Sequence, residues 1–134
     1  MGQSTAEWET PQALFDKLNK AFGFETDLCA TRQNAKCVDF FTIEDDALSQ
    51  ERRDRCWMNP PYDRTIRRWV KKAYESAQVG ALIVCLLPAK TDTAWWQDYA
   101  TKGDITFIRG RLKFNCSKDN APFPSAIVIF WPKP

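Results

Sequence analysis

Residues 55–87 read RCWMNPPYDRTIRRWVKKAYESAQVGALIVCLL and contain the clearest structural pattern of the chain. Apolar side chains recur at helical spacing over 64–78, which predicts a helix. Residues 55–58 before it predict a short strand. The continuous apolar run at 81–87 after it is typical of a strand that is buried on both faces of a sheet. A strand, a helix and a strand in this order predict an α/β fold with a mostly parallel sheet.

The segments on either side extend this alternation of helices and strands. Thr10 is predicted as the N-cap, and Pro11 as the first residue, of a helix that ends at Gly23. Asp92 is predicted to cap a later helix. The remaining predicted elements are strands at 24–29, 38–42, 105–108, 112–114 and 125–131, and a turn of helix at 45–51. We therefore expect one domain, 1–134, with helices on both faces of its sheet.

The composition is that of an ordinary soluble globular domain. The chain has 134 residues, of which 44% are hydrophobic and 27% are charged. Its formal net charge of +2 is too small to indicate nucleic-acid binding by itself. No stretch approaches the roughly 18 apolar residues of a membrane span, and residues 1–9 lack the apolar core of a signal peptide. We expect no membrane association.

The chain contains no histidine and five cysteines, none of them in a Cys-x-x-Cys pair. This composition argues against a zinc site and against a nucleophile activated by histidine. The cysteines are expected to be reduced, mostly buried thiols of an intracellular protein. Any chemistry should therefore depend on carboxylates, amides, aromatic rings or a bound cofactor.

The tetrapeptide Asn59-Pro60-Pro61-Tyr62 follows the predicted strand at 55–58. Its simplest interpretation is a rigid turn that ends the strand, because proline cannot donate to a ladder. A functional interpretation uses the side-chain oxygen of Asn59 and the carbonyl of Pro60 as two acceptors, beside the flat ring of Tyr62. Such a site suits a planar ligand that carries an –NH2 group. We favour this second interpretation.

Asp27 lies at the end of another predicted strand. Ligands of open α/β sheets bind outside the carboxyl ends of the strands. Asp27 and the tetrapeptide at 59–62 are therefore expected to face one crevice.

The chain resembles the phage-type DNA N-6-adenine methyltransferases, the Dam-like enzymes of bacteriophages and prophages. The resemblance covers nearly the whole chain, in a fixed order of blocks, which makes it more specific than the tetrapeptide alone. The blocks are 8–11, 14–15, 24–30, 40–42, 46–48, 57–62, 86–89, 91–96, 109–114 and 121–126.

This resemblance implies methyl transfer from S-adenosylmethionine to the exocyclic N-6 amine of adenine in DNA, with the base flipped out of the duplex. The implied fold is a shortened, Rossmann-like sheet of S-adenosylmethionine-dependent methyltransferases. The implied partner is DNA, without a metal, and the implied setting is the cytoplasm of a bacterial host that carries a phage or prophage. Protection of phage DNA from restriction is the purpose that the family suggests, and we expect a monomer or a weak homodimer.

The resemblance also assigns residues. It implies catalytic roles for Asn59, Pro60 and Tyr62 and cofactor contacts for Thr10, Pro11, Asp27, Cys29, Glu44 and Asp46. Asp45 is a further candidate for the acidic residue that holds the ribose. Phe114 is implied as a second aromatic residue that grips the target base.

Basic residues provide the expected DNA contacts. Five of them lie on the polar face of the predicted helix at 64–78, namely Arg64, Arg67, Arg68, Lys71 and Lys72. A solvated surface would have the same pattern. Because this face directly follows the tetrapeptide, we favour contact with DNA phosphates, above all by Arg67 and Lys71. Arg109, Arg111 and Lys113 form a second basic group.

Two departures from the family pattern leave alternatives open. The usual Phe-x-Gly-x-Gly loop is absent, since Leu28-Cys29-Ala30-Thr31 follows Asp27, and the short chain lacks one strand-helix unit and a separate target-recognition domain. One alternative is a methyltransferase for another amine, in RNA adenine, cytosine or protein glutamine, which the tetrapeptide at 59–62 alone cannot exclude. The other is a catalytically inactive module that only binds DNA.

Overall fold

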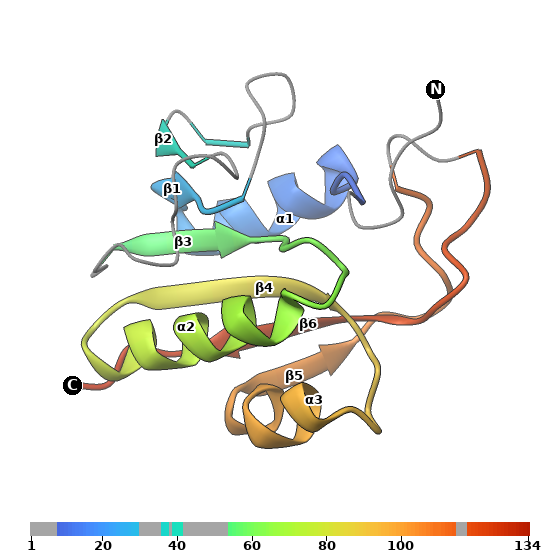
Figure 1. Ribbon diagram of the computed structural model, residues 1–134. Helices are drawn as coiled ribbons and strands as arrows, with labels where there is room; N and C mark the ends of the chain where they lie inside the picture. Colours follow the sequence, from blue (N-terminus) through green and yellow to red (C-terminus); the bar gives the residue numbers. More distant parts are fainter. Residues whose placement is uncertain (1–7, 30–35, 38, 42–53, 115–117) are drawn as a thin grey trace.

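The computed structural model describes residues 8–29, 36–37, 39–41, 54–114 and 118–134. These residues form one six-stranded sheet with the order β2-β1-β3-β4-β6-β5 (Figure 1). The strands are β1 (Thr26–Asp27), β2 (Asp39–Phe40), β3 (Arg55–Met58), β4 (Leu82–Pro88), β5 (Asp104–Phe107) and β6 (Ser125–Phe130).

The sheet is mixed. β1 pairs in parallel with β2 and with β3, and β3 pairs in parallel with β4. β6 is inserted between β4 and β5 and runs antiparallel to both. The α/β class is thus confirmed, whereas the sequence pattern did not reveal the direction of the last strand.

Helices cover both faces of the sheet. α1 (Gln12–Phe22) packs on one face through Phe15, which joins a cluster with Trp57, Val84 and Leu86. α2 (Ile66–Gln78) and α3 (Ala94–Asp98) cover the other face, where side chains of the alternate strand positions point. A short 3-10 helix, η3 (Ala100–Lys102), follows α3. In Figure 1, α2 lies across β4 and β6 on this second face.

The start of α1 differs from the prediction. The helix begins at Gln12, so Pro11 is its N-cap residue, with φ −58° and ψ 131°, and no side chain caps it. The prediction that Thr10 caps α1 was wrong because the Thr10 hydroxyl lies near a distant residue, Asn59, instead. The helix ends as predicted at Gly23, whose φ of 63° is the left-handed conformation that glycine adopts without strain.

The other predicted elements vary in length more than in position. The helix predicted over 64–78 begins at Ile66, and α3 is capped by Thr93 rather than by Asp92, since the Thr93 side chain accepts a hydrogen bond from the backbone of Trp96. The strand predicted at 24–29 is limited to β1, and residues 112–114 form no strand. Residues 38, 42 and 45–51 lie outside the described part of the chain.

The carboxyl ends of β1, β2, β3 and β4 lie at one edge of the sheet, because these strands pair in parallel. β5 and β4 are both antiparallel to β6, so the carboxyl end of β5 lies at the same edge. The connection from β5 to β6 extends beyond this edge on the right of Figure 1. We call this side the carboxyl edge.

In the described residues, no helix combines the length and apolar character needed to cross a membrane.

Substitution of Gly103, which directly follows η3, tests how closely the backbone there approaches β6 of the sheet. A β-carbon added there would lie 2.8 Å from the carbonyl oxygen of Ile129 and 2.8 Å from Cγ1 of Val128. Because neither the backbone of a central strand nor a buried side chain can move freely, Gly103→Ala should lower the free energy of unfolding by about 1–3 kcal/mol. Urea denaturation measures the change.

Gly110→Ala is the matched control. Its added β-carbon would meet no atom within 4 Å, and only the backbone φ of 74° opposes the substitution. This strain alone should cost about 1 kcal/mol. A Gly103→Ala protein that is as stable as the wild type would contradict the close approach.

Candidate active site

β3 carries the tetrapeptide at 59–62 to the centre of the carboxyl edge. β2 lies on one side of β1 and β3 on the other, so the order of the strands reverses between β1 and β3. Asp27 pairs with Trp57, and the backbone N–H of Leu28 donates to the carbonyl of Trp57 at 2.9 Å. The ends of these two strands are therefore adjacent, as expected from the sequence. Crevices for ligands form at such switch points.

The two prolines end strand β3 abruptly. Pro60 and Pro61 are buried and directly follow Met58, the last residue of the strand, and Asn59. Neither proline has an N–H group, so the ladder cannot continue through them. The chain turns here and enters α2 through Thr65, where the Asp63 side chain accepts a hydrogen bond from the Thr65 backbone at 2.8 Å.

Asn59 is half-buried and both donor positions of its amide are used. Its Nδ2 donates to the backbone carbonyl of Trp8 and to the hydroxyl oxygen of Thr10, the latter at 3.0 Å. Because a backbone carbonyl can only accept a hydrogen bond, the nitrogen of the amide must face Trp8. The orientation of the Asn59 amide is therefore determined by its partners.

Two acceptors of the tetrapeptide remain without a donor. Oδ1 of Asn59 is buried and has no hydrogen-bond partner in the described part of the chain. The carbonyl of Pro60 likewise accepts no hydrogen bond from any described residue. Buried acceptors without partners are rare in folded proteins. A ligand with an –NH2 group could donate one hydrogen to each of them.

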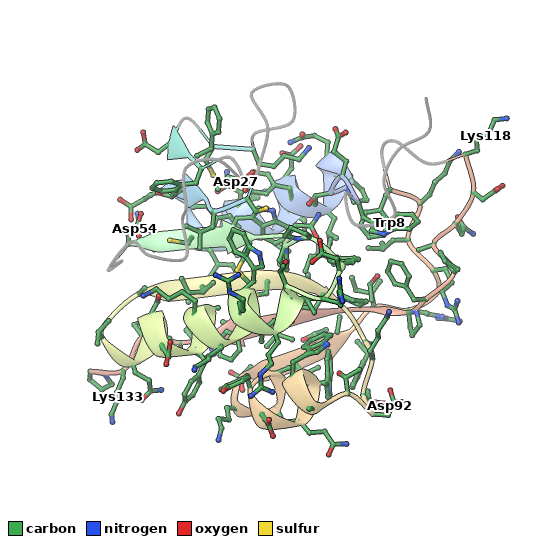
Figure 2. All side chains as sticks on the ribbon, in the orientation of Figure 1. Trp8, Asp27, Asp54, Asp92, Lys118 and Lys133 are labelled. Atoms are coloured by element: carbon green, nitrogen blue, oxygen red, sulfur yellow. The ribbon has the colours of Figure 1, made fainter. Side chains whose placement is uncertain are left out.

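The ring of Tyr62 belongs to a group of four aromatic rings in mutual contact, which we call the aromatic cluster: Trp8, Tyr62, Phe114 and Phe123. The ring centroids of Tyr62 lie 5.6 Å from Phe123 and 6.3 Å from Phe114. Trp8 lies 5.4 Å from Phe114 and 5.3 Å from Phe123. Figure 2 labels Trp8 close to the connection between β5 and β6. Phe114 is buried, whereas the other three rings are partly exposed.

Tyr62 is held by its hydroxyl group, which donates to the backbone carbonyl of Leu86 at 3.0 Å. Burial, with a smaller contribution from Cys85, raises the pKa of Tyr62 well above its usual value. The hydroxyl is thus a neutral donor, and its hydrogen bond to Leu86 restrains the Tyr62 ring.

Asp27 is buried at the end of β1 and contacts the backbone of two later residues, Cys29 and Lys36. Its two carboxylate oxygens accept hydrogen bonds from the backbone N–H groups of Cys29 at 3.2 Å and Lys36 at 3.0 Å. Burial raises the pKa of Asp27 from 3.8 to about 6, although these two hydrogen bonds and the charge of Lys36 oppose the increase. The Lys36 ammonium donates to the side chain of Gln12 at 2.9 Å and so links Lys36 to the start of α1.

The remaining residues implied in cofactor binding are only partly placed. Thr10 is buried beside Asn59, and Pro11 and Cys29 are partly exposed. Glu44 and Asp46 lie outside the described residues, as does Asp45. In the described part of the chain, no three histidine, cysteine or acidic side chains gather as a metal site would require.

The two basic groups differ in their surroundings. Arg67 on α2 forms an ion pair with Asp98 at 3.3 Å, and its guanidinium lies 5.4 Å from the ring centroid of Tyr99. Lys71 is exposed one turn further along the helix. Arg109, Arg111 and Lys113 are exposed on the connection after β5, without an ion pair among the described residues.

Trp8 and Phe123 had not been singled out as site residues from the sequence. Phe123 lies between two prolines, Pro122 and Pro124, which is a poor context for a core strand. Trp8 directly precedes the segment that contains Thr10. The sequence does show that both aromatic residues lie in segments without a predicted helix or strand. It does not show which other rings they contact in the fold.

The chain is similar to one protein family and to several known proteins. Residues 2–132 match the family model described as DNA N-6-adenine-methyltransferase (Dam). Over 138 aligned positions the chain is 29% identical to the DNA N-6-adenine-methyltransferase of Haemophilus phage HP1 (strain HP1c1), covering 94% of this chain and 79% of that protein. It is 33% identical over 94 residues to the DNA N-6-adenine-methyltransferase of Escherichia phage T1, covering 68% of this chain and 39% of that protein.

A shorter match is to the putative methyltransferase YfdM of Escherichia coli (strain K12). It is 38% identical over 64 residues, covering 42% of this chain and 70% of that protein.

Asp27 predicts a specific dependence of stability on pH. Its pKa of about 6 lies above the value of 3.8 expected in the unfolded chain, so the folded state binds more protons between these two pH values. The stability that Asp27 contributes is complete below pH 3.8 and is lost as the pH rises through about 6. In Asp27→Asn this contribution should vanish.

Urea denaturation of the wild type and Asp27→Asn between pH 4 and pH 7 tests this expectation. From pH 4 to pH 7, the free energy of unfolding of the wild type should decrease by about 2–3 kcal/mol relative to that of the variant, at 1.36 kcal/mol per pKa unit. A difference between the two proteins that stays constant with pH would contradict the raised pKa.

Proposed function

Because the chain belongs to the DNA N-6-adenine-methyltransferase (Dam) family, we propose that it transfers a methyl group from S-adenosylmethionine to the exocyclic N-6 amine of adenine in DNA. The relatives named for this activity come from phages HP1 and T1. The observation that carries the proposal is the pair of unpaired acceptors at Asn59 and Pro60.

These acceptors suit an aromatic amine. The adenine amine has two hydrogens, and its lone pair is delocalised into the ring, so that it is a poor nucleophile. Hydrogen bonds to Oδ1 of Asn59 and to the carbonyl of Pro60 would hold the nitrogen and favour a tetrahedral, nucleophilic geometry. Positioning of this kind can contribute about 7–11 kcal/mol to a reaction.

S-adenosylmethionine supplies an electrophilic methyl group on a positively charged sulfur. As the new bond from N-6 to the methyl carbon forms, the bond from carbon to sulfur breaks and its electron pair goes to sulfur. The methylated amine then loses one of the protons that face Asn59 and Pro60. These neutral acceptors orient the proton on its way to solvent, and no residue of the chain becomes covalently modified.

The residues at the switch point fit such a cofactor. Thr10 offers a hydroxyl group beside Asn59, and Asp27 offers a carboxylate on the strand next to Trp57; both residues are buried. Because both oxygens of Asp27 accept hydrogen bonds from the backbone of Cys29 and Lys36, we propose that Asp27 shapes the cofactor site by holding these two residues. Pro11 and Cys29 would line the same crevice, and Glu44, Asp45 or Asp46 would hold the ribose.

The base would reach this site by flipping out of the duplex, since a stacked base cannot enter it. Oδ1 of Asn59 has no accessible surface, so the surrounding side chains must open to admit a base. The partly exposed ring of Tyr62 offers a stacking surface, which would offset the cost of flipping by about 1–3 kcal/mol. Phe114 would support this ring from below, because it is itself buried.

We further propose that residues 1–134 form a single domain built on a shortened, Rossmann-like methyltransferase sheet. The order β2-β1-β3-β4, with its reversal between β1 and β3, supports the Rossmann-like assignment. The protein would act as a monomer or a weak homodimer on DNA in the cytoplasm of a bacterial cell, in line with the phage and bacterial origin of its relatives.

Two groups of basic residues are proposed to contact DNA phosphates. Arg109, Arg111 and Lys113 follow β5 directly at the carboxyl edge, beside the aromatic cluster. Arg67 and Lys71 lie on α2, which starts at this edge and runs away from it, so that Lys71 lies about 6 Å further back than Arg67 at 1.5 Å per residue. The group at 109–113 therefore has the better position.

Substitution of Asn59 tests the proposed chemistry. Asn59→Ala should abolish transfer of tritiated methyl groups from S-adenosylmethionine to unmethylated DNA, because the base amine loses an acceptor. Affinity for the cofactor should stay within about tenfold of the wild type, under about 1.4 kcal/mol. Digestion of the DNA product to nucleosides should yield labelled N-6-methyl-2′-deoxyadenosine with the wild type.

Asn19→Ala is the control, since it removes an amide of the same size from the end of α1, where Oδ1 accepts from the backbone of Phe24 at 2.7 Å. This variant should retain turnover. Measurable turnover by Asn59→Ala would rule out the catalytic assignment. Label in cytosine, RNA or protein would identify a different amine as the substrate, and DNA binding without any label would favour a binding module.

Salt dependence of DNA binding separates the two basic groups. Substitution of Arg109, Arg111 and Lys113 by glutamine should make the salt dependence of DNA binding weaker. The slope of the logarithm of the DNA association constant against the logarithm of the salt concentration should decrease in magnitude by up to about 2.7, at 0.9 per phosphate contact. Arg67→Gln with Lys71→Gln should flatten it by less, because Arg67 is partly neutralised by Asp98. Equal slopes for all three proteins would exclude both groups from the DNA interface.

A further inference from the structure

Residues 8–10 cross the tetrapeptide and contact Asn59 at two points. The Trp8 carbonyl and the Thr10 hydroxyl together accept both hydrogens of the Asn59 amide, at 3.0 Å in the case of Thr10. We call residues 8–10 the strap. These contacts join residues about fifty positions apart in the sequence, so the tertiary fold, not the local chain, orients the amide.

The orientation of this amide decides what the site can bind. The terminal torsion of asparagine is broad and roughly two-fold, so that an unrestrained amide can exchange its oxygen and nitrogen positions at little cost. In the observed orientation, the unpaired Oδ1 is available as an acceptor. In the reversed orientation, an –NH2 group would face the –NH2 group of the substrate, and two donors repel each other.

From this geometry we infer that Thr10 is a positioning residue for methyl transfer. The Trp8 carbonyl sets which end of the Asn59 amide faces the strap, and the Thr10 hydroxyl accepts the second amide hydrogen and so holds the amide where its oxygen can accept a hydrogen from the target amine. The inference rests on the proposed function of Asn59 and extends it to a second residue. It differs from the cofactor contact that the family resemblance implies for Thr10.

The strap is anchored well enough to impose this orientation. At one end the Trp8 ring packs against Phe114 and Phe123, with centroids 5.4 and 5.3 Å apart. At the other end Pro11 leads into α1, where its carbonyl accepts from the backbone of Phe15 at 3.2 Å. Thr10 between them is only 3% exposed. Water therefore has little access to replace the Thr10 hydroxyl as an acceptor.

Thr10→Val and Thr10→Ser separate the hydroxyl group from the shape of the side chain. Valine has nearly the shape of threonine but offers no acceptor, and one amide hydrogen of Asn59 is then left buried without a partner. Thr10→Val should reduce kcat at saturating DNA and cofactor by about tenfold or more, and should change the Kd of S-adenosylmethionine by less than about threefold. Thr10→Ser should restore kcat to within about threefold of the wild type.

Thr101→Val is the matched control. It also removes a hydroxyl group with a hydrogen bond, here to the carbonyl of Gln97 at 2.8 Å, but on the exposed surface of η3. Its kcat should equal that of the wild type.

A second readout does not depend on turnover. In 15N-labelled protein, the signals of the Asn59 side-chain amide are assigned by their absence in Asn59→Ala. Thr10→Val should shift this pair and accelerate its hydrogen exchange by about tenfold or more, whereas Thr10→Ser should leave both unchanged. This measurement remains informative even if the wild type does not methylate DNA, so failure of the proposed function and failure of this inference are distinguishable.

Two results would overturn the inference. One is a Thr10→Val protein whose Asn59 amide signals and exchange equal those of the wild type. The other is a Thr10→Val protein with weakened binding of S-adenosylmethionine but unchanged kcat at saturation, which would make Thr10 a cofactor ligand only.

Discussion

Parallel pairing of β3 with both β1 and β4 is the constraint on which the site depends. It places the ends of β1 and β3 side by side, so that Asp27 and Asn59 come to one edge although they are far apart in sequence. The same pairing requires the chain to return from the end of β3 to the start of β4, and α2 makes this crossover. The loop before α2 must therefore lie at the carboxyl edge, and it is this loop that contains the tetrapeptide.

The prolines give that loop its chemical character. At a buried strand end, the backbone carbonyls normally accept hydrogen bonds from N–H groups of the following residues or of a neighbouring strand. After Met58 no such partner exists, because Pro60 and Pro61 supply no N–H groups. The result is an acceptor pair on a rigid turn, held between two packed faces of the sheet. Tyr62 contributes to this rigidity, since it packs against both hydrophobic clusters and bonds to Leu86 of β4.

Sequence patterns predicted the parts of the fold that depend on local periodicity. The strand at 55–58, the helix after it and the apolar strand β4 are all present, because burial on one helix face or on both strand faces leaves a direct trace in the sequence. The insertion of β6 between β4 and β5 leaves no such trace, since strand order is decided by pairing over long distances. Thr10 shows the same limit. Its position before Pro11 suggested a helix cap. In the structure its hydroxyl instead accepts a hydrogen bond from Asn59, a distant contact that local sequence rules do not predict.

The candidate site was predictable to the same extent. Asn59, Pro60 and Tyr62 were identified from one tetrapeptide because their chemistry is carried by adjacent residues. Trp8 and Phe123 were not, because an aromatic residue outside regular structure gives no sign of the ring that it meets. The roles proposed for Asp27 and Cys29 depend likewise on a loop whose hydrogen bonds the sequence does not reveal.

The chemistry of the tetrapeptide is independent of protonation, and this follows from the groups that surround it. Its acceptors are an amide oxygen and a backbone carbonyl, neither of which titrates. Burial raises the pKa values of Tyr62 and Cys85, the titratable groups packed beneath the site, so that both stay neutral at physiological pH. Asp27 is different, because its pKa of about 6 lies within the range in which cells operate. If Asp27 has the role in the cofactor site that we propose, a change of activity near that pH would come from its contacts with Cys29 and Lys36, whereas the proposed orientation of the target amine by Asn59 would not change.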